Sequence, residues 1–103
     1  MGLTSFAKTV TTSGTRVNLK STSYIVWEAA IKAPASNTGT IYVGGSDVDS
    51  TVGYPLAAGE SVSLSQLAER HGYNLQDFAV DLNTVWLDAS VSGEGVRILT
   101  VAR

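Results

Sequence analysis

The sequence predicts an all-β fold, a compact β-sandwich or jelly-roll-like domain with at most one or two short helical turns. Apolar and polar residues alternate with a period of two in several separate stretches, as they do in half-buried strands. There are 12 Ser and 11 Thr, and only 16% of the residues are charged, which favours pleated, partly exposed surfaces. Clusters of Gly, Asn, Asp and Ser separate the alternating stretches, as is typical of short strands joined by turns. The length of 103 residues fits one domain over residues 1–103.

The clearest strand is predicted over residues 24–33, which are rich in β-branched and aromatic side chains. We expect one face of this strand to carry Ile25, Trp27, Ala29, Ile31 and Ala33. Residues 96–102 form an almost continuous apolar run, so this strand is expected to be covered on both faces. Further strands are predicted at residues 6–12, 15–20, 40–43, 60–65 and 85–91.

Turn residues punctuate these strands, because Gly, Asn and Asp accept the backbone angles that tight turns require. The run Ser36-Asn37-Thr38-Gly39 predicts a hairpin turn before the strand at residue 41, and Gly93-Glu94-Gly95 predicts a second one. A single short helix is predicted over residues 65–70, with Ser65 as its cap and Gly72 as its stop. Another turn is expected at residues 76–78.

Few side chains suit catalysis or metal binding. His71 is the only histidine and there is no cysteine, so the residue types for a histidine-rich metal site or thiolate chemistry are missing. No Gly-x-Ser-x-Gly elbow accompanies the histidine, which argues against a Ser-His-Asp triad. Asp47 and Asp49 lack the further ligands of a calcium loop. We therefore expect no enzymatic activity, no catalytic residue, no metal and no cofactor.

Nucleic acid and membranes are also not expected as partners. The net charge is −2 and the basic residues form no cluster in the sequence, whereas a phosphate-binding face needs a basic patch. The first residues lack the basic start and long apolar run of a signal peptide. The longest apolar stretches are far shorter than a membrane span.

Several apolar or aromatic residues are left on faces that are expected to point outwards, and exposed apolar surface often marks an interface. Two alternatives stay open for them, contact with a partner or cover by another segment of the same chain. The candidate interface residues are Phe6, Val10, Tyr42, Trp86, Leu99 and Val101.

Residues 39–103 resemble small virion structural proteins of tailed bacteriophages, most of all capsid decoration (cement) proteins. The shared order is a strand ending in Gly-Gly, a Pro-Leu-x-x-Gly-Glu turn into an alternating strand, and two closing strands. The stretches that carry the resemblance are Ile41-Tyr42-Val43-Gly44-Gly45-Ser46-Asp47-Val48, Gly53-Tyr54-Pro55-Leu56-Ala57-Ala58-Gly59-Glu60-Ser61-Val62-Ser63-Leu64, Val85-Trp86-Leu87-Asp88-Ala89-Ser90 and Gly93-Glu94-Gly95-Val96-Arg97-Ile98-Leu99. The segment 66–78 departs from this pattern.

The resemblance implies a protein that binds the outer surface of a capsid and stabilises the contacts between capsomers. Its partners would be the major capsid protein and itself, as a homotrimer, and it would be made in the host cytoplasm and reside in the virion. Residues 1–12 would be an arm that grips the capsid or an edge strand. Two alternatives stay open: a phage neck or tail structural component, and a carbohydrate- or receptor-binding β-sandwich in which Trp86, Tyr42 or Tyr54 stacks on a sugar.

Overall fold

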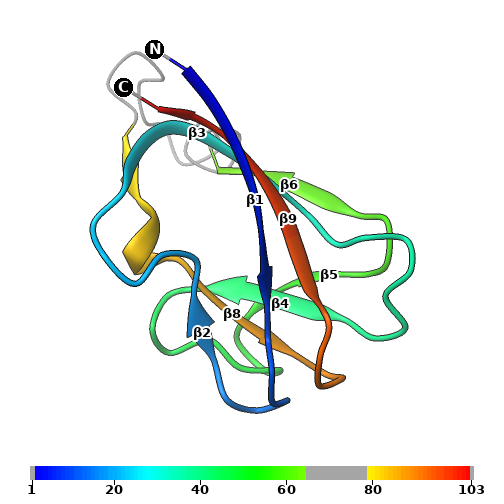
Figure 1. Ribbon diagram of the computed structural model, residues 1–103. Helices are drawn as coiled ribbons and strands as arrows, with labels where there is room; N and C mark the ends of the chain where they lie inside the picture. The colour runs from blue at the N-terminus through cyan, green and yellow to red at the C-terminus, as the bar shows by residue number, and fades with distance from the viewer. Residues whose placement is uncertain (1, 65–78, 103) are drawn as a thin grey trace.

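The computed structural model describes residues 2–64 and 79–102. They form two antiparallel sheets packed face to face (Figure 1), so the prediction of an all-β sandwich is confirmed. The elements are β1 (Gly2–Thr9), β2 (Val17–Asn18), β3 (Ile25–Lys32), β4 (Ile41–Gly44), β5 (Tyr54–Leu56), β6 (Ser61–Ser63), β7 (Val80–Asp81), the 3-10 turn η2 (Leu82–Thr84), β8 (Trp86–Ala89) and β9 (Gly95–Ala102).

Sheet A has the strand order β1-β9-β3-β6, with β7 also paired to β3, and sheet B has the order β2-β8-β4-β5. The connections β3–β4 and β8–β9 therefore pass from one sheet to the other. The two predicted hairpin turns, at residues 36–39 and 93–95, are wrong in this respect. Turn residues specify that the chain reverses, but not whether the next strand pairs with the last one or crosses to the facing sheet.

The core lies between the two sheets and is filled from both of them. Sheet A contributes Val26, Ala29 and Ile31 from β3 and Val96 and Ile98 from β9, all at most 2% exposed. Sheet B contributes, among others, Ile41 from β4, Leu56 from β5 and Leu87 from β8. This alternation of buried and exposed residues along each strand is what fixes strand register in a sandwich.

A β-bulge in β3 overturns part of the predicted face of that strand. The register against β9 shifts between Val26 and Glu28, and an extra residue in a bulge moves the following side chains to the other face. Val26 is consequently fully buried, while Ile25 and Trp27 are 50% and 38% exposed. The expectation that Ile25 and Trp27 share the face of Ala29 and Ile31 is wrong.

Strand β9 is covered on one face and not on both. Val96 and Ile98 are buried in the core, but Arg97 is exposed and Leu99 is 48% exposed. The expectation of cover on both faces is wrong because, within the described residues, no element is packed over the outer side of sheet A.

Other sequence predictions fare unevenly. Residues 1–12 were predicted to be either an arm or an edge strand. Of these, residues 2–9 form strand β1 at the edge of sheet A. Strands β5 and β7, of three and two residues, were not predicted. The predicted helix over residues 65–70, the turn at 76–78 and His71 lie outside the described residues.

The Glu94 carboxylate ties the β8–β9 turn to the β3–β4 connection. One of its oxygens accepts hydrogen bonds from the Thr38 N–H at 2.6 Å and the Thr38 hydroxyl at 2.9 Å, and the other accepts from the Gly39 N–H at 2.8 Å. These bonds favour the ionised form and hold the pKa of Glu94 below its ordinary value of 4.5, the Thr38 N–H contributing most. A single side chain thus holds together two of the connections that pass between the sheets.

Acid should therefore destabilise the protein, and Glu94→Gln should weaken this dependence. A carboxyl whose pKa is lower in the folded chain than in the unfolded chain stabilises the fold above its ordinary pKa, and that stabilisation is lost as the pH falls through the folded pKa. Glu94→Gln should be less stable than the wild type at pH 7, with a smaller further loss between pH 5 and pH 3. Urea unfolding at several pH values measures the free energy of unfolding of the two proteins. If this free energy fell with pH by the same amount in both, Glu94 would not have the role described.

Candidate functional site

The outer face of sheet B is largely covered by loops of the same chain. Val48, in the loop after β4, is 1% exposed. A Cβ placed on Gly44 would lie 3.1 Å from the Val48 Cγ2, and one on Gly53 would lie 2.5 Å from the Tyr42 Cβ. The loop between β4 and β5 therefore rests on the outer side of β4, and it leaves Tyr42 only partly exposed.

A buried carboxylate anchors a second covering loop on the same face. Asp88 of β8 is 5% exposed, and its Oδ1 accepts hydrogen bonds from the Gly14 N–H at 2.9 Å and the Ala89 N–H at 2.7 Å. The Ser13 hydroxyl donates to the Ala89 carbonyl at 2.7 Å. The β1–β2 connection is thereby held against β8, whose Trp86 is also only partly exposed.

The outer face of sheet A, in contrast, is open among the described residues. Strands β1, β9 and β3 present three rows of side chains there, each row crossing the three strands. The rows are Leu3, Val101 and Glu28; Ser5, Leu99 and Ala30; and Ala7, Arg97 and Lys32. Leu3 is 71% exposed and Leu99 48%. We call this surface the open face and define it by Leu3, Ser5, Ala7, Ala30, Lys32, Arg97, Leu99 and Val101.

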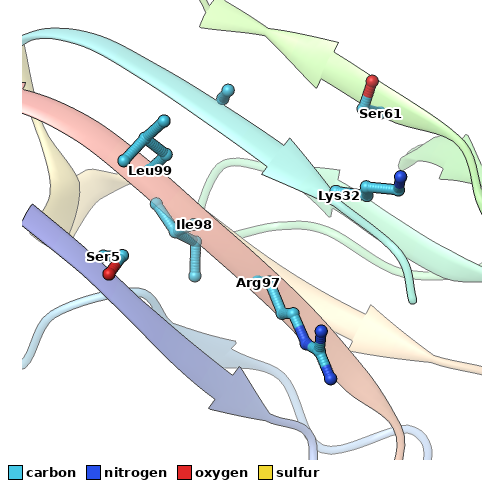
Figure 2. Close-up of a pocket in the computed structure, with 7 residues that line it drawn as sticks. Ser5, Lys32, Ser61, Arg97, Ile98 and Leu99 are labelled. Carbon is cyan, nitrogen blue, oxygen red and sulfur yellow. The ribbon is translucent and has the colours of Figure 1, made fainter.

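A shallow groove of about 440 Å³ runs along the open face. Figure 2 shows Ser5 of β1, Arg97 and Leu99 of β9, Lys32 of β3 and Ser61 of β6 on neighbouring strands around it. Small side chains such as Ser5 and Ala30 leave the space, and the longer Leu99 and Arg97 border it. Because the groove is open to solvent, it encloses a small molecule less well than a typical ligand pocket does.

Two cations face each other at one end of this groove. Lys32 and Arg97 are directly opposite on β3 and β9, an arrangement of like charges that costs stability in a sheet. Neither has a carboxylate within ion-pair distance among the described residues. Glu28, two rows away, accepts hydrogen bonds from the Ser63 hydroxyl at 2.9 Å and the Ala29 N–H at 2.8 Å. The cationic end of the open face is chemically suited to carboxylates on a partner.

The six candidate interface residues are distributed over different environments. Leu99 and the partly buried Val101 both lie on the open face. Phe6 is partly buried, with the Lys20 Nζ 4.2 Å from its ring centroid. Val10 is fully buried in the core and does not reach the surface.

Sequence reasoning missed the cationic half of the surface. Lys32 and Arg97 are far apart in sequence, and they meet only through the pairing of β3 with β9. The signal that was available is the alternation in β9, where Arg97 interrupts the apolar run two residues before Leu99.

The remaining carboxylates with lowered pKa have structural explanations. The Thr51 hydroxyl, at 2.6 Å, does most to lower the pKa of Asp49. The Ser23 hydroxyl, at 2.5 Å, does most to lower that of Asp81, which also caps η2. Each carboxylate holds its own turn or cap. Across residues 2–64 and 79–102, no three His, Asp or Glu side chains gather as a metal site would require.

Comparisons with known proteins add no family to these observations. The chain matches no protein-family model, no curated protein and no solved structure. In the part of the chain that is described, no helix has the length and apolar character needed to cross a bilayer.

Proposed function

We propose that this protein acts by binding and not by catalysis, as a decoration protein on the outer surface of a phage capsid. The observation that supports this proposal is the open face. Among the described residues it exposes Leu3 and Leu99 and two cations without an ion-pair partner, whereas the outer face of sheet B is covered by loops. Contiguous exposed apolar surface of this kind marks interaction sites. The proposed partner, the major capsid protein, follows from the resemblance of the sequence between Ile41 and Leu99 to cement proteins.

The proposed mechanism is linkage between binding and assembly. A ligand that binds the assembled lattice but not free subunits stabilises the lattice by mass action. A rigid sheet face is suited to this task, because a preorganised surface loses little conformational entropy on binding. Leu99 and Leu3 would provide the apolar contact, and Lys32 and Arg97 would pair with carboxylates of the capsid.

We rank this function above carbohydrate binding on the exposure of the aromatic residues. A sugar platform needs an aromatic ring with a free face. Tyr42 and Trp86 are partly buried and lie on the face that the loops cover, while Tyr54 is 44% exposed at the edge strand β5. These three rings are therefore less accessible to a sugar than the open face is to a partner protein.

The test is co-sedimentation with expanded, DNA-free capsids of the virus that encodes this chain. The wild-type protein should co-sediment and should raise the temperature at which the capsids disassemble. Leu99→Ser and Arg97→Glu should each weaken binding by about tenfold or more, equivalent to about 1.4 kcal/mol. Val52→Ser is the matched control, because Val52 is 64% exposed in the loop on the sheet B side.

Three outcomes would overturn the proposal. The first is a wild-type protein that stays in the supernatant at all capsid concentrations. The second is binding to purified neck or tail assemblies instead of capsids, which would favour the neck or tail alternative. The third is equal loss of binding in Val52→Ser and Leu99→Ser, which would remove the open face from the contact.

A further inference from the structure

Within residues 2–64 and 79–102, strand β1 has a row of backbone hydrogen-bonding groups that no other strand uses. It is the outermost strand of sheet A, and all eight of its residues pair with β9 without a register shift. Beyond β1, the Val10 N–H donates to the Glu94 carbonyl at 2.9 Å, as the register of an even-numbered residue requires, and the Val10 carbonyl accepts from the Gly93 N–H at 2.8 Å, where the turn begins. Because the bonded pairs alternate in an antiparallel ladder, even-numbered residues of β1 bond to β9. The N–H and C=O groups of Leu3, Ser5, Ala7 and Thr9 therefore point out of the sheet.

The pairing of β3 with β6 and with β9 leads to the same conclusion about which residues of β1 bond to β9. On the far side of sheet A, the Ala33 N–H donates to the Glu60 carbonyl at 2.9 Å and the Gly59 N–H donates to the Ala33 carbonyl at 2.8 Å. Odd-numbered residues of β3 thus bond towards β6, and even-numbered ones, such as Ala30, bond to β9. The backbone groups of Leu99, which is paired with Ala30, therefore bond to β3. The even-numbered residues of β9 are then the ones that bond to β1.

This edge lacks the features that usually protect an edge strand. Natural sheets block their edges with short strands, proline, bulges or charges. Strands β2 and β6 are two and three residues long, and β5 has three residues that include Pro55. Strand β1, in contrast, is eight residues long, unbroken, and carries Lys8 as its single charge. It is the edge in the described structure that is best suited to accept another strand.

We propose that a second copy of this chain pairs with β1 in antiparallel orientation, with the Phe6 residues of the two copies facing each other on a two-fold axis. This register lets all four free residues of each copy bond, since Leu3 then faces the second copy's Thr9 and Ser5 faces the second copy's Ala7. A shift by two residues in either direction leaves one of them without a partner. The two sheets A become one continuous sheet across the axis.

The charges of β1 and the open face are compatible with this pairing. Lys8 of each copy lies opposite the second copy's Thr4, so no like charges face each other at the junction. The row that contains Arg97 and Ala7 continues into the second copy's Ser5 and Leu99. The cations of one copy thus adjoin the apolar part of the other, and the two open faces join into one larger surface. Isologous two-fold contacts are the commonest form of self-association.

The proposal does not depend on the capsid function, and it differs from the homotrimer that the resemblance implies. Light scattering of the purified chain should give twice the monomer mass of 10.8 kDa at high concentration. Ser5→Pro should raise the dissociation constant by about tenfold or more, because proline removes a donor from the open edge but leaves the β9 ladder intact. Ser5→Thr retains the N–H and should dimerise as the wild type does.

Amide hydrogen exchange gives a second readout that needs no substitution. In the dimer, the amides of Ser5 and Ala7 should become protected as the concentration rises, whereas those of Thr4 and Phe6 should be protected at all concentrations. A mass of one or three chains, fast exchange at Ser5 and Ala7 at high concentration, or dimerisation unchanged by Ser5→Pro would overturn the proposal.

Discussion

Gly95→Ala should destabilise the protein by at least about 3 kcal/mol, which is more than most single substitutions do. Gly95 begins β9 and pairs with Thr9 at the end of β1. A Cβ at Gly95 would lie 2.7 Å from the Thr9 Cα, 2.9 Å from the Lys8 carbonyl carbon and closer still to the Lys8 oxygen. All three are backbone atoms, so relief requires β1 to move away from β9.

Urea or guanidinium unfolding monitored by tryptophan fluorescence measures this effect. Gly2→Ala is the matched control, because Gly2 lies at the other end of the same strand pair and nothing is within 4 Å of its added Cβ. It should change the free energy of unfolding by less than about 0.5 kcal/mol. Equal stability of Gly95→Ala and the wild type would show that the β1–β9 pair does not end as the structure describes.

The fold class was predictable from the sequence because alternation and turn residues are local properties. The strand β4 is an example, since Ile41 and Val43 are buried as the alternation indicates. The face of β3 was predicted only in part, because the bulge near Trp27 arises from the pairing of β3 with β9. Nothing in the local sequence marks the residue at which the register shifts.

The arrangement of the strands into two sheets depends on contacts that are distant in sequence. Glu94 reads locally as the middle of a Gly-Glu-Gly turn, yet its carboxylate binds Thr38 and Gly39, more than fifty positions away. Asp88 likewise reads as an exposed residue of an alternating strand. It is buried because the β1–β2 connection folds over it and donates the Gly14 N–H.

Of the open face, the sequence singled out Leu99 and Val101, but not Leu3, Lys32 or Arg97. Leu99 stands out because consecutive residues of a strand point to opposite faces. If Ile98 points into the core, Leu99 must point outwards, whichever strands lie beside β9. The pairing of Lys32 with Arg97 follows only from the register of β3 against β9. For the same reason the unused edge of β1 becomes visible only when the strand order places β1 outermost.

Truncation of two leucines, Leu87 and Leu99, should have very different effects on stability. Leu87 of β8 is fully buried and lies between Val17 and Val43 of the flanking strands. Leu87→Ala should cost about 2–5 kcal/mol of unfolding free energy, because it leaves a cavity that a packed core fills only partially. Leu99→Ala removes the same atoms from a side chain that is 48% exposed, and should cost less than about 0.5 kcal/mol.

The comparison separates residues that hold the sandwich together from residues that are available to a partner. Denaturant unfolding of the two variants, at a concentration where the protein is monomeric, measures the difference directly. If Leu99→Ala cost as much as Leu87→Ala, Leu99 would be packed by its own chain, and the open face would not be free to bind a capsid. If Leu99→Ala is as stable as the wild type but binds capsids weakly, the apolar exposure of β9 is explained by binding, since folding does not require that leucine.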